Sequence, residues 1–343
     1  MGERTTQADV DAARRTPGET TGTTSEATTE PTTRTAGERW WTPDRLDVPE
    51  SAPADLVDMA SSFEPPVLTA DTVLDPWRAS ALGGVLGRGA LTTGEPLPLG
   101  WHEIWFRDPL ATGGVAEDGH AEEHALMPRR RPRRRVYAGA TLTQHEPFHV
   151  GDEVHKTSGV TGCRLVPGRT GWLLIITESH RYAVDGRLHL EETRRVALRH
   201  DAPDTPEATG GSRPKVAADP APVIDDADVA LEVTADPTLL FRFSALTYNP
   251  HRIHYDRDYA TRVEGHADLL VHGPLTALLA LEAVRAVGAS TGAPVTYDFR
   301  LRGPAYLGRP VRFAVRSESG TAVVTGEQEG RLVITGEVGS PPA

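Results

Sequence analysis

The sequence predicts an α+β fold made of two similar halves, in each of which an antiparallel sheet curls around a helix. Three observations support this prediction. A short stretch of sequence recurs in the second half of the chain, strand-like segments follow one another with short turns between them, and one helix is apolar on nearly every side. The chain has 343 residues, which is enough for two domains of ordinary size.

The recurring stretch is Pro147–Val154 in the first half and Pro304–Val311 in the second. Both segments contain a proline, a small or apolar residue, any residue, an aliphatic residue, a glycine, two variable residues and a valine. They lie 157 residues apart, and strand-like alternation precedes and follows each of them. The matching position within each half indicates an internal duplication.

Eight segments have the residue pattern of strands, and turn-forming glycine, proline or aspartate residues lie between them. In the first half they are Val136–Gln144, Glu153–Thr161, Trp172–Ala183 and Leu188–Leu198, and in the second half Val295–Leu301, Val311–Ser317, Ala322–Glu327 and Arg331–Gly336. Consecutive strands joined by short turns pair antiparallel, so each half is expected to contain an antiparallel sheet.

The clearest helix is predicted over Pro274–Val287, because proline suits the first helical position and Gly288 suits the position after the end. Only Thr276, Glu282 and Arg285 are distinctly polar within it, so the helix should be buried rather than lie on the surface. It is too short to cross a bilayer. An antiparallel sheet curled around one buried helix is the hot-dog architecture, and the predicted fold is therefore a double hot-dog.

Two polar stretches divide the chain. Residues 1–38 contain no Leu, Ile, Phe, Tyr or Trp, and we expect them to form a disordered tail. Residues 200–222 are rich in proline and are expected to form a linker. The predicted domains are residues 40–199, a degenerate hot-dog with a structural role, and residues 223–340, the catalytic hot-dog.

Composition excludes several classes of protein. Acidic residues outnumber basic ones by 48 to 36, and the net charge of −12 argues against nucleic acid as a partner. Cys163 is the single cysteine, so an intrachain disulfide and a zinc site with several cysteines are excluded. Neither a membrane-spanning stretch nor an apolar N-terminal signal is visible, and a cytoplasmic location without membrane attachment is expected.

The segment richest in reactive groups precedes the predicted buried helix. His251, His254, His266 and His272 fall within 22 residues there. Histidine is the usual side chain for moving protons near neutral pH, so this segment is the candidate active site. The alternative is that these histidines decorate a polar loop.

This segment resembles the hydratase motif of MaoC-like enzymes, and more narrowly the hydroxyacyl-thioester dehydratase type 2 family. That family is a two-hot-dog branch that includes mesaconyl-C4-CoA hydratase and 3-methylfumaryl-CoA hydratase. The resemblance covers about residues 55–340. In the second half it rests on Asn249–Asp256 and Leu270–Leu275, and in the first half Leu97–His102, Arg134–Gly139 and Phe148–Asp152 support it.

The resemblance implies a hydro-lyase that adds or removes water across the α,β double bond of an enoyl thioester and needs no cofactor. It places the catalytic histidine at His254. The family's catalytic aspartate position is occupied by Asn249, and the asparagine of its motif is replaced by His251. An asparagine cannot transfer a proton as an aspartate does, but its amide can orient a water or a substrate hydroxyl.

The expected chemistry needs a base for water and a donor for the thioester oxygen. The imidazole of His254 suits the first task. The backbone N–H of Gly273, at the start of the predicted helix, suits the second. His251, Arg252 and His272 are expected to contact the substrate, which would be an acyl-CoA or an acyl-carrier-protein thioester. We also expect that two copies of the chain can associate as a homodimer.

Other interpretations remain open. The spacing of His251, His254, Asp256 and His266 matches no established zinc signature, so no metal is expected. Six arginines within Arg129–Arg135 form either a solvated loop or a receiver of CoA phosphates. Alternative functions are a 3-hydroxyacyl-carrier-protein dehydratase, a hot-dog acyl thioesterase, and an acyl-binding protein without catalytic activity.

Overall fold

The computed structural model of the chain describes residues 33–35, 40, 42, 45–128, 134–168, 171–199, 220–221, 224 and 229–341. Most of the predicted tail, most of the predicted linker and most of the arginine run lie outside these residues. Thr33–Thr35, at the end of the predicted tail, form strand β1 and pair with strand β3, Val67–Val73. The end of that segment therefore belongs to the sheet, which differs from the prediction for residues 1–38.

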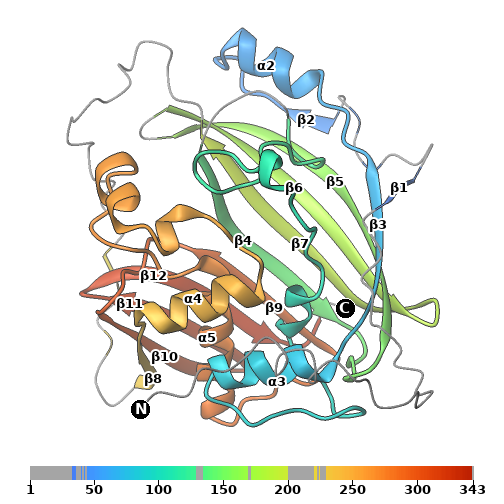
Figure 1. Cartoon of the computed structure of the whole chain (residues 1–343), viewed down its shortest axis with the longest axis vertical. Helices are drawn as coiled ribbons and strands as arrows, with labels where there is room; N and C mark the ends of the chain where they lie inside the picture. The colour runs from blue at the N-terminus through green and yellow to red at the C-terminus, as the bar shows by residue number, and fades with distance from the viewer. Residues whose placement is uncertain are drawn as a thin grey trace, which may run out of the picture.

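A sheet of twelve strands forms the body of the described structure (Figure 1), with all neighbouring strands antiparallel except β2, Leu46–Asp47, which runs parallel to β5. The order along the sheet is β1-β3-β5-β6-β7-β4-β9-β12-β11-β10-β8. The other strands are β4 (Arg134–Gln144), β5 (Glu153–Gly168), β6 (Gly171–Val184), β7 (Arg187–Arg199), β8 (Val229–Thr234), β9 (Val295–Leu301), β10 (Pro310–Glu318), β11 (Thr321–Gln328) and β12 (Arg331–Gly339). All eight predicted strands are confirmed, and β1, β2, β3 and β8 are additional.

The predicted helix is helix α5, Gly273–Ala286, and it is buried as expected. Nine of its residues are buried, and it contacts strands β8, β10, β11 and β12 of the second half. Figure 1 shows α5 lying against the curved sheet, with α4 (Pro237–Leu246) nearby and α3 (Pro76–Val85) near the other half. None of the helices in the described ranges is long and apolar enough to span a membrane.

The recurring stretch of sequence marks the same turn in both halves. The N–H of Gly151 donates to the carbonyl of Leu74 at 2.8 Å, and the N–H of Gly308 donates to the carbonyl of Ala235 at 2.9 Å. Both glycines have a positive φ, 102° and 72°, which most other residues adopt only with strain. The duplication inferred from the sequence therefore has a direct structural counterpart.

The two halves differ at the central helix. In the second half, Val271 pairs with Ala305 just before α5, and in the first half Leu97 makes the same type of bond to Phe148. The chain that follows Leu97 forms only the 3-10 turn η3, Trp101–Ile104. In the described part of the first half, the helix at this position is thus reduced to one short turn.

The space that a longer helix would occupy is filled by other groups. Trp101 and Trp105 are almost fully buried there. Gly100, just before η3, lies so close to α5 that an added Cβ would be 3.0 Å from Leu278 Cδ2. Helix α5 thus closes against the first half as well as against its own.

The two half-sheets join where β4 pairs with β9. The register runs from Gly139 opposite Arg300 to Gln144 opposite Val295, and at its centre Thr141 faces Asp298. These two residues are separated by the same 157 residues as the recurring stretch, so the pseudo-twofold axis passes between them. The Thr141 hydroxyl and Arg195 Nη2 both bind the Asp298 carboxylate, the latter at 2.9 Å.

Gly139 at this junction predicts a stability test. Its φ is 142°, and an added Cβ would be 2.2 Å from the carbonyl oxygen of Phe299. We expect Gly139→Ala to lower the free energy of unfolding by about 1–3 kcal/mol or more, because the paired strands must move apart. Urea denaturation measures the change. Gly113→Ala is the control, since an added Cβ there meets nothing within 4 Å. Equal stability of both variants would contradict the role given to Gly139.

Candidate active site

The motif segment begins where helix α4 ends. Asn249 donates its N–H to the carbonyl of Ser244 at 2.9 Å, and its side-chain Oδ1 accepts the N–H of His251 at 3.1 Å. Tyr248, just before it, has a φ of 46°. An asparagine side chain that binds the backbone two residues ahead is a common way to fix such a turn. Asn249 therefore shapes the loop through Oδ1, and its Nδ2 group remains for other contacts.

His254 is buried, with 7% of its surface exposed, on the 3-10 turn η6, Arg252–His254. Its Nδ1 lies 2.9 Å from the carbonyl oxygen of Leu270. Because a carbonyl only accepts, Nδ1 carries the proton and Nε2 presents a lone pair. Burial lowers the pKa of His254 to about 4, against the opposing effect of the Leu270 hydrogen bond. The ring is therefore neutral at neutral pH.

His272 holds the ring of His254 in place. The two rings stack with centroids 3.7 Å apart and an angle of 19°. His272 is fully buried, and its Nε2 lies 2.8 Å from Ser244 Oγ. Burial, with smaller effects of His254 and His251, keeps the pKa of His272 well below its usual value. An inaccessible neutral ring fits a supporting role better than the substrate contact predicted for His272.

Gly273 follows His272 and starts helix α5. Within the described part of the chain, its N–H has no hydrogen-bond acceptor. An added Cβ would be 2.5 Å from Leu301 Cδ1 and 3.5 Å from Tyr137 Cδ1, so the position has no room for a side chain. An unpaired N–H at the positive end of a helix is a suitable place for a developing negative charge.

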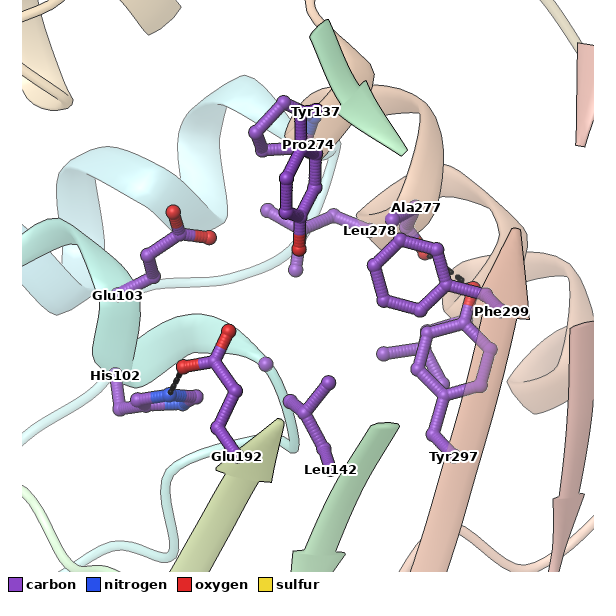
Figure 2. A pocket seen from close by; sticks show the side chains of 12 residues that line it. His102, Glu103, Tyr137, Leu142, Glu192, Pro274, Ala277, Leu278, Tyr297 and Phe299 are labelled. Atoms are coloured by element: carbon purple, nitrogen blue, oxygen red, sulfur yellow. Dashed lines mark hydrogen bonds and ion pairs between the residues drawn. The ribbon is translucent and has the colours of Figure 1, made fainter. Parts of the chain in front are cut away.

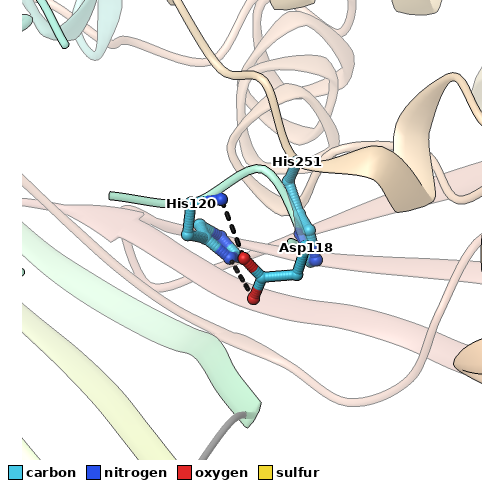
Figure 3. A group of neighbouring side chains, drawn as sticks. All are labelled: Asp118, His120 and His251. Carbon is cyan, nitrogen blue, oxygen red and sulfur yellow. Dashed lines mark hydrogen bonds and ion pairs between the residues drawn. The ribbon is translucent and has the colours of Figure 1, made fainter. Parts of the chain in front are cut away.

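A loop of the first half reaches this site, which the sequence did not predict. An Asp-Gly-His sequence, residues 118–120, lies against the motif loop of the second half (Figure 3). Gly119 has a φ of 93°, and an added Cβ would be only 1.9 Å from the carbonyl oxygen of Pro250. The N–H of Arg252 donates to the Asp118 carbonyl at 2.9 Å. Only glycine permits this contact between the two halves.

The side chains of this loop extend a row of imidazoles. His120 donates its N–H to Asp118 Oδ1 at 2.9 Å, and its Nδ1 lies 3.1 Å from Asp118 Oδ2. The ring of His120 lies 3.9 Å from that of His251, centroid to centroid, and His251 lies 5.6 Å from His254. His251 thus lies between the first-half loop and His254. Figure 3 shows it beside Asp118 and His120 of that loop.

The same group could hold a divalent metal ion. Asp118, His120 and His251 each offer one ligand atom, and these atoms lie within 4.8 Å of one another. Two imidazoles and a carboxylate are a ligand set that transition metals accept. The hydrogen bonds between His120 and Asp118 account for the arrangement of that pair without an ion. The expectation that the protein needs no metal stays a prediction.

Arg252, predicted to contact the substrate, makes several contacts within the protein. Its guanidinium donates to Asp256 Oδ2 at 3.1 and 2.7 Å and to the Glu117 carbonyl at 3.1 Å. It also stacks over the ring of Tyr259, 4.1 Å from the centroid. With these partners, Arg252 joins the two loops, which favours a positioning role over contact with the substrate.

A narrow pocket lies beside the start of α5 (Figure 2). Its cavity volume is about 20 Å³, which is room for about one water molecule. Pro274 lines it, and so does Tyr137, which also contacts the position of Gly273. The remaining lining residues are Gly100, His102, Glu103, Leu142, Glu192, Ala277, Leu278, Leu281, Tyr297 and Phe299. Through Pro274 and Tyr137, one wall of the pocket lies close to the start of α5.

Fold and site together define the class of this protein as a MaoC-like double hot-dog protein, with a buried histidine beside the start of its central helix. The chain belongs to the hydroxyacyl-thioester dehydratase type 2 family, whose sequence profile matches residues 100–307. This confirms the resemblance found in the sequence.

Relatives and solved structures agree with this assignment. Mesaconyl-C(4)-CoA hydratase of Chloroflexus aurantiacus is 34% identical over 229 residues, covering 66% of this chain and 78% of that protein. The mitochondrial hydroxyacyl-thioester dehydratase type 2 of Schizosaccharomyces pombe is 38% identical over 88 residues, covering 25% of this chain and 29% of that protein. HtdX of Mycobacterium tuberculosis has a similar fold, with a TM-score of 0.58 and 18% identity over 80% of this chain and 99% of its own.

The buried state of His254 predicts how stability depends on pH. Its pKa is about 4 in the folded protein and about 6.5 when unfolded, so the unfolded chain binds more protons between these values. Stability is therefore full above pH 6.5 and falls as the pH decreases towards 4. Between pH 7 and pH 5 this residue should account for a loss of about 2 kcal/mol.

Urea denaturation at both pH values measures this loss. We expect His254→Gln to weaken the pH dependence by about the amount that His254 contributes, because glutamine does not titrate. Gly113→Ala, at a position where an added Cβ meets nothing within 4 Å, is the control and should keep the wild-type dependence. An unchanged pH dependence in His254→Gln would show that His254 is not buried in the neutral form.

Proposed function

We propose that this protein adds water to, or removes water from, the α,β double bond of an enoyl thioester, with an acyl-CoA as the substrate. The observation that carries the proposal is the pairing of two groups at one place. His254 is buried, neutral and fixed in one tautomer, and the unpaired N–H of Gly273 follows the ring that stacks on it. The hydratase and dehydratase names of its relatives support the same reaction.

In the hydration direction, Nε2 of His254 takes a proton from water as the water oxygen bonds to the β-carbon. The electron pair of the double bond moves towards the thioester carbonyl, whose oxygen becomes negative. The Gly273 N–H and the positive end of α5 stabilise that oxygen. His254 then returns the proton to the α-carbon, so that one water is added in total. Since burial lowers its pKa, the protonated ring releases the proton readily.

The neighbouring residues position these groups. We assign to His272 the support of the His254 ring, and to Arg252 the contact between the loops of the two halves. Asn249 stands where the family has a catalytic aspartate, and its Oδ1 fixes the motif turn. Its Nδ2 group is assigned the orientation of the attacking water. His251, in contact with His120, is assigned to the mouth of the site, where it meets the substrate.

Three properties remain expectations from the sequence: the cytoplasmic location, the homodimer and the choice between CoA and a carrier protein. Light scattering on the full chain tests the homodimer. Assays with crotonyl-CoA, mesaconyl-C4-CoA, 3-methylfumaryl-CoA and a carrier-protein enoyl thioester test the carrier and the acyl group. Absorbance of the enoyl-thioester band separates the rival functions. A hydratase changes that band, a thioesterase releases free thiol, and a binding protein does neither.

The role of His254 predicts a kinetic result. We expect His254→Ala to lower kcat by roughly 100- to 10,000-fold, the usual scale of general acid–base catalysis, with little change in KM. Enoyl-thioester absorbance measures the rate, and circular dichroism verifies that the variant folds. His145→Ala, a remote surface change, is the control and should keep wild-type activity. Near-full activity of folded His254→Ala on every thioester tested would refute the proposed mechanism.

The role of Asn249 predicts a smaller effect. Asn249→Ala should raise the barrier by about 1–3 kcal/mol, the scale of one hydrogen bond to a polar group, because no proton passes through it. Asn249→Asp restores the residue of the general family and should keep substantial activity. The pH profile of kcat for Asn249→Asp is the second measurement. If Asn249→Ala loses as much activity as His254→Ala, the asparagine has a more direct part in the chemistry.

A further inference from the structure

Three side chains at the junction of the two halves form a group that the proposed mechanism does not explain. Asp118 and His120 come from the first half, and His251 comes from the motif loop of the second (Figure 3). Their ligand atoms all lie within 4.8 Å of one another, and all three residues are partly buried. Within the described ranges, no other group of three or more histidine, cysteine, aspartate or glutamate residues has this spacing.

The backbone holds the two first-half residues of this group on a tight turn. The N–H of Ala116 donates to the carbonyl of His120 at 2.8 Å, and the N–H of Gly119 donates to the carbonyl of Ala116 at 2.9 Å. The bond from the Arg252 N–H to the Asp118 carbonyl fastens this turn to the motif loop. Ligands that the backbone already holds in place lose little freedom when an ion binds to them.

The imidazole of His251 has no hydrogen-bond partner within the described part of the chain. The backbone N–H of His251 is bound to Asn249 Oδ1, whereas the ring lies against the rings of His120 and His254. The ring of His120, 3.9 Å away between centroids, belongs to the histidine that is paired with Asp118. A neutral imidazole has a lone pair that metal ions bind. The lone pair of His251 is therefore available to an ion placed beside this pair.

The ligand set favours a transition metal. Imidazole nitrogens suit zinc, copper and nickel, whereas magnesium and calcium prefer oxygen ligands. Ligand atoms around a tetrahedral zinc ion lie about 3.3 Å apart, because the bonds are about 2.0–2.1 Å long. His120 Nδ1 and Asp118 Oδ2 are 3.1 Å apart, which is close to that value. The third ligand, His251, reaches the same geometry with a side-chain shift of about 1.5 Å or less.

The proton and the nearby charge of the group also permit a cation. An ion between His120 and Asp118 replaces their hydrogen bond, and the imidazole then carries its proton on Nε2. The guanidinium of Arg252, the residue after His251, is paired with the Asp256 carboxylate at 2.7 Å, which reduces its repulsion of an ion. Because the group is only partly buried, water can complete the coordination.

We propose that Asp118, His120 and His251 bind a transition-metal ion, for which Zn²⁺ is the best match, and that the bound ion inhibits the reaction. The ring of His251 lies 5.6 Å from that of His254, centroid to centroid. An ion bound to His251 fixes this ring, removes its contact with the substrate and adds positive charge near the base. The metal site is independent of the proposed function, in which no metal takes part, and only the inhibition rests on that function.

Calorimetry on the full chain, freed of metals with a chelator that is then removed, tests the site. The wild type should bind one Zn²⁺ at this site, and excess Mg²⁺ should not displace it. Asp118→Asn, His120→Gln and His251→Gln should each raise the Kd for Zn²⁺ by about tenfold or more, because each removes one ligand. Circular dichroism verifies that the variants fold. Absence of Zn²⁺ binding, or a wild-type Kd in all three folded variants, would overturn the proposal.

His155→Gln is the matched control. His155 Nδ1 lies 2.7 Å from Asp71 Oδ1, so this pair resembles that of His120 and Asp118, but no third ligand among the described residues completes it. The Kd of His155→Gln for Zn²⁺ should equal that of the wild type. X-ray absorption of the zinc-loaded wild type is a measurement that needs no variant. It should show two imidazole ligands, and a spectrum without imidazole would contradict the assigned site.

Hydration of an enoyl thioester with and without Zn²⁺ tests the inhibition. Saturating Zn²⁺ should lower kcat/KM several-fold, a chelator should restore it, and Asp118→Asn should lose this response to Zn²⁺. Full activity of the wild type with Zn²⁺ bound would refute the inhibitory role. If no enoyl thioester is hydrated, the proposed function fails, whereas calorimetry and X-ray absorption still decide whether the metal site exists.

Discussion

Pairing between β4 and β9 is the constraint on which the rest of this structure depends. Because the two half-sheets share this ladder, they curve as one surface, and the groups on their inner face must fit a single space. Helix α5 takes most of that space and contacts both halves. The first half accordingly keeps only a single turn where its own helix would be. The pocket forms between that turn and α5, so its existence follows from the way the sheets join.

The structure treats buried ionisable groups in two opposite ways. His254 and His272 lie among stacked rings without a carboxylate partner, and burial keeps both of them neutral. Glu192 is just as deeply buried but stays charged, because Arg194 binds both of its oxygens. Whether a buried ionisable group is neutral or charged therefore depends on whether a residue of opposite charge, often distant in the sequence, lies beside it. The candidate active site contains the neutral histidines, and the wall of the pocket contains the charged Glu192.

Much of the second half could be predicted from the sequence, since its signals are local. The alternation of β9–β12 and the apolar surface of α5 come from neighbouring residues. The motif segment contains both His254, whose Nδ1 binds the Leu270 carbonyl, and Gly273, which begins α5. The contribution of residues 118–120 could not be predicted in this way. Asp-Gly-His is an ordinary loop sequence, and its structural role is evident only from the contact of Gly119 with Pro250 of the other half.

The strands that were not predicted were missed for a similar reason. Strands β3 and β8 each lead into a helix through an Asp-Pro pair, Asp75-Pro76 and Asp236-Pro237. Their spacing differs by a few residues from that of the recurring stretch, so a search at one offset overlooks them. The absence of a central helix in the first half could not be predicted either. It depends on the volume that α5 occupies, and no local sequence pattern indicates that volume.

The close fit of Gly119 against Pro250 has a consequence for stoichiometry. A symmetric pair of hot-dog subunits presents two equivalent centres, one from each copy. Here the first half has no motif loop between α3 and η3 comparable to Asn249–Asp256 and instead contributes a loop to the single centre of the second half. A duplicated chain of this kind therefore holds one motif loop for two hot-dog units, and the half without that loop contributes a neighbouring loop to it.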